Sequence, residues 1–450
     1  MGCAWALAQY PELFEVSVWD KEPVPGGMAT SEEIVLDGER VVINDGVQGG
    51  APSYRNTLLL HERFGFTVRN VSLKVSFGQG SKSWHNSATS ASDATNLQTR
   101  LQSDIQSFAK LMKLVAKMEK LFTLIPIGTL LRVCRFSEEF INHMVFALTG
   151  LFFATGQQHK YVPASVIAKV FLDPDLKLFD LDSKLFLSNA PPMFAFDRLR
   201  DIYSSMMAEM QVSGVAFHLD RAAASMQRQR DSTVVVSDSL GVSEQFDAVV
   251  FCCDADTALN ILGDGATWWE RQVLGNVVYF HDVTVTHTDS EYMRNHFEVS
   301  DSRQDMYFIR TYESPYEADV EMGFNLAAYQ NLSSKVTTPV WQTIFLDANT
   351  SERWTKDKID PSSVVLEKWW KQPSARVQHF LKVVPWLRMI QGENTLFAGS
   401  WTLINTHEVA LMSGFAAAYR LGAAYPFPDD RVAFKQFATY LSVIHGVSYQ

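Results

Sequence analysis

TLFAGSW (395–401), TLINTHE (402–408) and VALMSGFAAAYRLGAAY (409–425) are the consecutive segments that decide the fold. The first segment predicts an apolar strand that ends near Gly399, and the second predicts a polar loop. The third predicts a helix whose small residues would let it lie close to a sheet. The N-terminus of that helix would offer unpaired N–H groups and a positive dipole end to an electron-rich group. The pattern also fits an ordinary capped helix in a tightly packed terminal region.

The first forty residues predict a matching set of elements. Gly2–Gln9 is small and apolar, which indicates a closely packed helix, and Glu15–Trp19 predicts a buried strand that is followed by Asp20. The turn PVPGG (23–27) comes next. Helix, strand, acidic residue and glycine pair form the second half of a Rossmann βαβ unit. We therefore predict an α/β protein with a Rossmann-like dinucleotide-binding domain.

Three features of such a domain can be assigned to residues. Gly2 stands where the last glycine of G-x-G-x-x-G would be, so the first strand of the unit would precede Met1 and the chain is expected to be N-terminally truncated. Asp20 has the spacing of the acidic residue that binds ribose hydroxyls. Gly26 and Gly27 would let bare backbone approach the cofactor, although they also fit a common loop after a strand.

Composition narrows the classes of function. The chain has 450 residues, of which 47% are apolar, and this length and composition suit two or three packed units. The net charge of -11 disfavours nucleic acid as a partner, and it disfavours docking on an anionic membrane by overall charge, while a local basic patch stays open. The four cysteines form no C-x-x-C pair, so we expect neither a disulfide framework nor a metal site. We expect a cytoplasmic location. The apolar segment 140–154 is short for a membrane span, so we expect a buried helix and no transmembrane segment.

Six segments, taken in order, resemble the flavin-containing amine oxidase superfamily. Within it, the closer resemblance is to a branch of FAD/NAD(P)-binding oxidoreductases related to polyunsaturated-fatty-acid isomerases. The segments are Val18–Ser31 (VWDKEPVPGGMATS), Asn44–Phe66 with SYRNTLLLHERFGF, Ile127–Phe171 with Pro163-Ala164, Phe246–Leu259 (FDAVVFCCDADTAL), His287-Thr288-Asp289 and Phe397–Gly422.

The resemblance implies FAD as the cofactor and assigns residues to its adenosine and pyrophosphate parts. Asp20 would hold the adenosine ribose. Gly26, Gly27 and Met28 would run beside the pyrophosphate and the ribityl chain. Ala223 would give backbone hydrogen bonds to the adenine.

The same resemblance assigns residues to the flavin end of the cofactor. Gly399 and Ser400 would contact the pyrophosphate or the ribityl end, and Glu408, Val409 and Ala410 would lie beside the ring. Many amine oxidases have Gly-Glu where this chain has Gly399-Ser400. The sequence identifies neither a ring-facing lysine nor an aromatic cage.

The expected architecture is a discontinuous FAD-binding domain, lacking its first strand, with an inserted α+β substrate domain. The FAD-binding domain would comprise 1–75, 215–265 and 385–430, the substrate domain 76–214 and 266–384, and a C-terminal helix 431–450.

The expected function is that of an FAD-dependent oxidoreductase that acts on a hydrophobic, lipid-like small molecule by hydride transfer to flavin. Alternatives are a flavin-dependent double-bond isomerase and a non-catalytic truncated remnant of the fold. No catalytic residue can be assigned. His407 is a candidate, but a histidine at a helix start is more often a structural cap, and His287 on a strand is more often a core residue.

Overall fold

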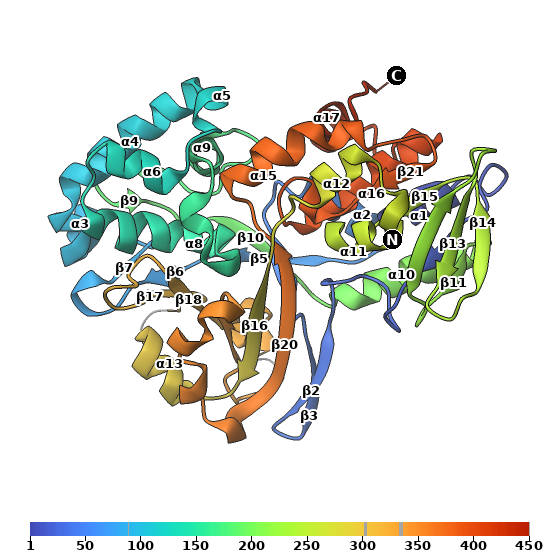
Figure 1. The fold of residues 1–450 in the computed structure, drawn as a ribbon. Coiled ribbons are helices and arrows are strands. Elements are labelled where there is room, and N and C mark those ends of the chain that lie inside the picture. The colour runs from blue at the N-terminus through green and yellow to red at the C-terminus, as the bar shows by residue number, and fades with distance from the viewer. Residues whose placement is uncertain (89, 301–303, 333–335, 450) are drawn as a thin grey trace.

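The computed structural model describes residues 1–88, 90–300, 304–332 and 336–449. Two pairs of parallel strands form the centre of the lobe that contains both termini (Figure 1). β1 (Ser17–Trp19) pairs with β11 (Ala216–His218), and β15 (Val249–Phe251) pairs with β21 (Thr395–Phe397). The strands predicted before Asp20 and Gly399 are therefore present, although β1 is half-buried where a buried strand was expected, and the mixed α/β class is confirmed.

Helices surround these strands, and two of them make the closest contact. α1 (Gly2–Ala8) lies against α16 (His407–Leu421), as their small residues predict. A Cβ atom placed on Gly414 would come within 2.8 Å of the Cys3 nitrogen, so only glycine permits this approach. The other helices of this lobe are α2 (Arg55–Arg63), α10 (Leu199–Val212), α11 (Ala255–Leu262), α12 (Trp268–Leu274), α15 (Val377–Lys382) and α17 (Arg431–Tyr440), which a π-helical turn extends to His445.

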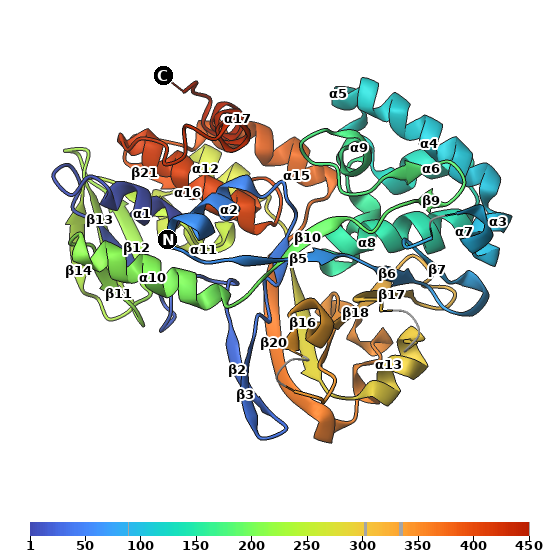
Figure 2. The same cartoon turned by 180° about the vertical axis from the view of Figure 1, so that it is seen from behind.

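An antiparallel sheet covers the outer side of this lobe, in the order β12-β13-β14 (Figure 2). Its strands are β12 (Ala223–Arg228), β13 (Val234–Asp238) and β14 (Ser243–Phe246). The apolar run at 232–237 predicts a strand, which forms as β13.

A seven-stranded mixed sheet forms the second lobe, in the order β20-β16-β19-β18-β17-β6-β7. β20 is its longest strand, and it runs from this sheet up to the lobe of the termini (Figure 1). The strands are β20 (Val364–Pro373), β16 (Tyr279–His287), β19 (Trp341–Phe345), β18 (Val320–Asn325), β17 (Tyr307–Thr311), β6 (Val75–Phe77) and β7 (Trp84–His85), accompanied by α13 (Ser290–Phe297) and α14 (Leu326–Tyr329).

A helical lobe lies beside the large sheet. The apolar spacing over residues 97–122 predicts one long helix. That prediction is wrong, because the chain leaves helical geometry at Leu101 (φ -97°, ψ 16°) and at Met118 (φ -117°, ψ 39°), and three helices form instead. The elements of this lobe are α3 (Asn96–Arg100), α4 (Gln102–Lys117), α5 (Glu119–Phe122), α6 (Ile127–Val133), α7 (Glu138–Phe140), α8 (Ala147–Phe153), α9 (Ala164–Leu172), β8 (Leu181–Asp182) and β9 (Phe186–Leu187).

The apolar segment 140–154 forms a π-helical turn, Ile141–Phe146, followed by α8, and most of its residues are buried. Across the described residues, every helix is too short or too polar to cross a bilayer.

One strand is shared by the two largest apolar cores. β10 (Pro192–Phe196) directs Phe194 and Phe196 into the core of the terminal lobe and Ala195 into the core beneath the helical lobe. Alternate side chains of a strand point to opposite faces, so β10 joins the two units. The other connecting strands are β2 (Glu32–Leu36), β3 (Glu39–Ile43), β4 (Gly49–Gly50) and β5 (Val68–Ser72).

Candidate functional site

The candidate site begins at the carboxyl ends of the parallel strands. Asp20 follows β1 and Cys252 follows β15. Cys252 is exposed to solvent, and the Cys253 carbonyl accepts a hydrogen bond of 3.1 Å from Nε1 of Trp401, just beyond β21. The ends of β15 and β21 are therefore linked beyond their strand pairing.

Asp20 is held by its backbone, while its carboxylate has capacity for further hydrogen bonds. Its N–H donates to the His218 carbonyl at 3.0 Å, and its own carbonyl accepts from Arg221 N–H at 2.8 Å. The carboxylate accepts from Glu22 N–H at 3.0 Å. Because two backbone bonds fix the chain here, Oδ1 and Oδ2 stay in place beside the strand end.

Arg221 does not neutralise Asp20, because two other carboxylates hold it. Its Nε lies 2.9 Å from Asp238, and one of its terminal nitrogens lies 2.7 Å from Glu244. The guanidinium stacks 3.6 Å from the centre of the Trp19 ring. β12 begins with Ala223 two residues later, so the predicted ribose and adenine contacts belong to neighbouring segments.

The glycine pair and Met28 form a loop whose backbone is approached closely by other segments. Gly26 has φ 127° and Gly27 has φ 60°, both in the region that favours glycine. A Cβ atom on Gly26 would lie 3.4 Å from the Tyr203 ring, whereas one on Gly27 would meet no protein atom within 4 Å. The Met28 carbonyl passes so close to Gly46 that a Cβ there would lie 2.3 Å away. One side of the loop is thus packed, and the side at Gly27 is open.

Gly399 and Ser400 link β21 to the large sheet. Gly399 has φ 139°, and its N–H donates to Ser413 Oγ at 2.8 Å. Ser400 Oγ donates to Asn405 Oδ1 at 2.8 Å, and Asn405 Nδ2 donates to Gln372 Oε1 on β20 at 3.1 Å. This chain of hydrogen bonds spans the boundary between the terminal lobe and the seven-stranded sheet.

The first turn of α16 has one exposed residue. Thr406 caps the helix by accepting from Val409 N–H at 3.2 Å, and Val409 itself is buried. Ala410 is exposed although residues 411–418 are all buried. Among the described residues, no group accepts a hydrogen bond from the N–H of His407 or Glu408. The first turn therefore combines these two N–H groups, which belong to buried residues, with one exposed small side chain at Ala410.

Glu408 is buried and faces α2. Its Oε1 accepts from the backbone and side-chain amides of Asn56, both at 2.8 Å, and its Oε2 accepts from the Thr57 N–H and O–H at 2.9 and 2.7 Å. Burial raises the pKa of this carboxyl, and the four hydrogen bonds oppose that rise. Of the residues predicted beside the ring, Ala410 is therefore accessible, whereas the Glu408 side chain caps α2.

His407 belongs to the same buried network. Its Nδ1 lies 3.1 Å from Thr57 Oγ1, and its Nε2 lies 2.5 Å from the Tyr203 hydroxyl. Because Thr57 donates its proton to Glu408, Nδ1 must be the donor and Nε2 the acceptor for Tyr203. Burial lowers the pKa of His407 to about 3, so the ring is neutral. The His407 side chain therefore connects α16 to Thr57 and Tyr203, while Thr406 is the residue that caps the helix.

Two lysines on β20 were not identified from the sequence. Lys368 Nζ lies 2.7 Å from Oδ2 of the buried Asp45, whose Oδ1 accepts from Thr30. Lys371 Nζ lies 2.6 Å from Asp256 and 3.3 Å from Asp254. These pairs join residues far apart in the chain, so no local pattern in the sequence indicates them.

The other histidines that the sequence singles out lie apart from this site. His287 is fully buried between β16 and β19, where its Nε2 lies 3.0 Å from Thr343 Oγ1. Burial lowers its pKa to about 4, as expected for a neutral core residue. His281 is exposed on the same strand.

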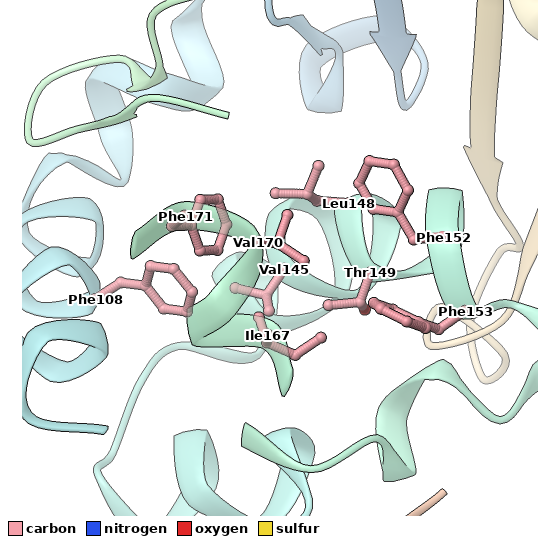
Figure 3. A pocket seen from close by; sticks show the side chains of 9 residues that line it. All are labelled: Phe108, Val145, Leu148, Thr149, Phe152, Phe153, Ile167, Val170 and Phe171. Atoms are coloured by element: carbon pink, nitrogen blue, oxygen red, sulfur yellow. The ribbon is translucent and has the colours of Figure 1, made fainter. Parts of the chain in front are cut away.

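A small apolar cavity lies in the helical lobe, between α4, the π-helical turn, α8 and α9 (Figure 3). Aromatic rings of Phe108, Phe152, Phe153 and Phe171 line it, and Thr149 is the only polar residue among the described ones that line it. Its volume of about 10 Å³ is too small for a substrate molecule.

No model of a known protein family matches the sequence, and no curated protein matches it either. The structure, in contrast, is similar to many solved structures. A fatty acid isomerase from P. acnes that produces CLA has a TM-score of 0.61 and 13% identity, covering 93% of this chain and 96% of the other.

Two amine oxidases are similar to the same extent. Cyclohexylamine oxidase from Brevibacterium oxydans IH-35A has a TM-score of 0.64 and 11% identity, covering 93% of this chain and 95% of the other. A putrescine oxidase with redesigned cofactor binding has a TM-score of 0.59 and 10% identity, with the same two coverages of 93% and 95%. The resemblance inferred from the sequence is thus confirmed for the fold, which this chain shares with amine oxidases and a fatty acid isomerase.

Proposed function

We propose that this chain is an FAD-dependent oxidoreductase of the amine-oxidase-like type. The observation that carries the proposal is the convergence of the Gly26 loop and the N-terminus of α16 on Tyr203. A Cβ atom on Gly26 would lie 3.4 Å from the Tyr203 ring. Tyr203 in turn binds His407 in the first turn of α16.

The residues at this convergence suit FAD. The Asp20 carboxylate is fixed and can accept hydrogen bonds from ribose hydroxyls. Ala223 lies in the neighbouring segment, and its backbone would bind the adenine. Open space beside Gly27 suits the close approach of a pyrophosphate or ribityl chain, with Met28 next to it. Gly2 at the start of α1 offers a second helix N-terminus for the phosphates.

The ring end has a matching set of groups. Gly399 and Ser400 would contact the ribityl end, and the turn Glu408, Val409, Ala410 would face the ring. The dipole of α16 favours negative charge at its N-terminus. When bound, FAD would supply the hydride acceptor, and this chain would orient the substrate C–H bond and exclude water.

We propose a hydrophobic, lipid-like substrate. The name of the similar fatty acid isomerase is compatible with it. Double-bond isomerisation is the second candidate for the same reason, and turnover without oxygen or another acceptor would favour it over oxidation.

The test is the visible absorption spectrum of the purified chain, before and after incubation with FAD, with the released cofactor identified. Ala410→Phe should lower the flavin content, because it fills the exposed position at the start of α16. Ala116→Phe is the matched control, an exposed alanine on α4. A chain that takes up no flavin, or equal flavin in both variants, would contradict the proposal.

A further inference from the structure

The outward face of α4 and α5 carries large apolar side chains that no other element covers. Leu114, Met118, Leu121 and Leu124 keep between 46% and 50% of their surface exposed. The inner side of α4 lies against α9 and carries the buried residues Phe108, Met112 and Val115. The exposed apolar residues are therefore additional to those that the core requires.

Four lysines occupy the same outward face. Lys110, Lys113, Lys117 and Lys120 are exposed, and none forms an ion pair with a described residue. Glu119, the only acid among residues 105–130, is already paired with Lys169 at 2.8 Å. Side chains three and four residues apart share one side of a helix, so Lys110, Lys113, Leu114 and Lys117 lie together on α4. Met118, Lys120, Leu121 and Leu124 follow directly beyond the end of α4 and are also exposed. We call the eight residues 110, 113, 114, 117, 118, 120, 121 and 124 the Lys/Leu face.

The Lys/Leu face is confined to one end of the helix. On the same side of α4, the preceding turns carry Ser103, Gln106 and Ser107, which are exposed and uncharged. α4 and α5 lie at the periphery of the helical lobe (Figures 1 and 2). It is a local basic surface on a chain with net charge -11.

We propose that the Lys/Leu face binds the surface of an anionic phospholipid bilayer. Interleaved leucines and lysines suit a membrane interface, where apolar side chains enter the acyl boundary and ammonium groups reach the phosphates. An acidic protein would pair the lysines but would leave isolated leucines without a matching groove. The negative charge elsewhere on the chain would turn other faces away from the same bilayer.

Binding through the Lys/Leu face would also set which part of the protein interior lies nearest the bilayer. Phe108, on the inner side of α4, lines the apolar cavity that Phe152 and Phe153 also line (Figure 3). Docking through α4 and α5 would bring that apolar interior next to the lipid. The binding itself requires neither flavin nor turnover, so it can fail or succeed independently of the proposed oxidoreductase activity.

The experiment is co-sedimentation of the full chain with vesicles of phosphatidylcholine alone and of phosphatidylcholine mixed with phosphatidylglycerol. We expect binding to the anionic vesicles, weaker at high salt, and little binding to the neutral ones. Lys113→Glu/Lys117→Glu should lower the partition coefficient at least tenfold, because each lysine near a charged surface contributes roughly fivefold. Leu114→Ser/Leu121→Ser should lower it while leaving the net charge unchanged.

The controls change the same residue types elsewhere. Leu240→Ser removes a leucine that is 89% exposed in another lobe, and Lys382→Glu reverses an exposed charge on α15. Both should bind vesicles like the unchanged chain, and circular dichroism should confirm that all four variants are folded. Equal binding to neutral vesicles, no binding to either, or loss in a control alone would overturn the proposal. So would an acidic polypeptide that binds the face while vesicles do not.

Discussion

Glu408 accepts both the backbone N–H and the side-chain O–H of Thr57, at 2.9 and 2.7 Å, across the boundary between α16 and α2. A helix N-terminus leaves its first N–H groups unpaired, and here a carboxylate from another helix satisfies them. The same carboxylate accepts two bonds from Asn56, whose Oδ1 accepts from the Tyr425 hydroxyl at 2.6 Å. The start of α16, beside the proposed ring, is thereby fixed to α2.

The first prediction concerns this carboxylate. Glu408→Gln keeps the shape but replaces one acceptor oxygen by an amide that faces the donors of Asn56 or Thr57. Hydrogen bonds to charged groups contribute about 1.5–3 kcal/mol each, so we expect the free energy of unfolding to fall by about 3 kcal/mol. Chemical denaturation would measure it. Glu393→Gln, at an exposed position, should change it by less than about 0.5 kcal/mol. Equal effects of the two changes would contradict the role of the carboxylate.

The second prediction concerns the tautomer of His407. The Tyr203 O–H donates to Nε2, so Tyr203→Phe would leave a buried acceptor without its donor. We expect the free energy of unfolding to fall by about 1–3 kcal/mol. Tyr161→Phe, an exposed tyrosine, is the control. If Tyr203→Phe and the control unfold at the same denaturant concentration, the hydrogen bond does not contribute to stability.

The third prediction is a pH dependence with an unusual sign. Asp282 on β16 is fully buried and accepts from the N–H of Asp347 at 2.8 Å and of Gly156 at 3.3 Å. Burial raises its pKa from 3.8 to about 7. The folded state then binds more protons than the unfolded state between these values, so stability falls as the pH rises toward and past 7.

Asp282→Asn removes this dependence because the amide cannot ionise. The free energy of unfolding of the variant, relative to that of the unchanged chain, should rise by roughly 3 kcal/mol from pH 5 to pH 8. Denaturation at both pH values would measure it. Asp429→Asn, at an exposed carboxylate, should show no such gain. A gain that is the same at pH 5 and pH 8 would show that ionisation of Asp282 is not its cause.

Local signals account for the part of the site that the sequence predicted. The strand before Asp20 and the turn at Gly26 and Gly27 depend on neighbouring residues, and they form as predicted. The strand before Gly399 and the helix that starts at His407 follow from equally local patterns.

Partners brought together by tertiary contact could not be predicted in this way. The pairing of Lys368 with Asp45 depends on β20 reaching the terminal lobe. The direction of the Glu408 side chain depends on the packing of α2 against α16. The break at Met118 overrode a regular apolar spacing that predicted one helix, because spacing alone does not report where the chain turns.

The fourth prediction concerns His61 on α2, which stacks on Phe196 with ring centres 4.8 Å apart. Among the described residues, neither ring nitrogen has a hydrogen-bond partner. Burial lowers its pKa from 6.5 to about 4. The unfolded state therefore binds more protons between these values, and the histidine lowers stability as the pH falls below 6.5.

His61→Leu removes that proton uptake and the buried, unpaired nitrogens. His61→Leu should raise the free energy of unfolding above that of the unchanged chain, and this increase should be about 2 kcal/mol larger at pH 5 than at pH 8. Thermal or chemical denaturation would measure it. His281→Leu, at an exposed position, should show no such difference. If His61→Leu shifts stability equally at both pH values, the protonation of His61 does not contribute to acid sensitivity.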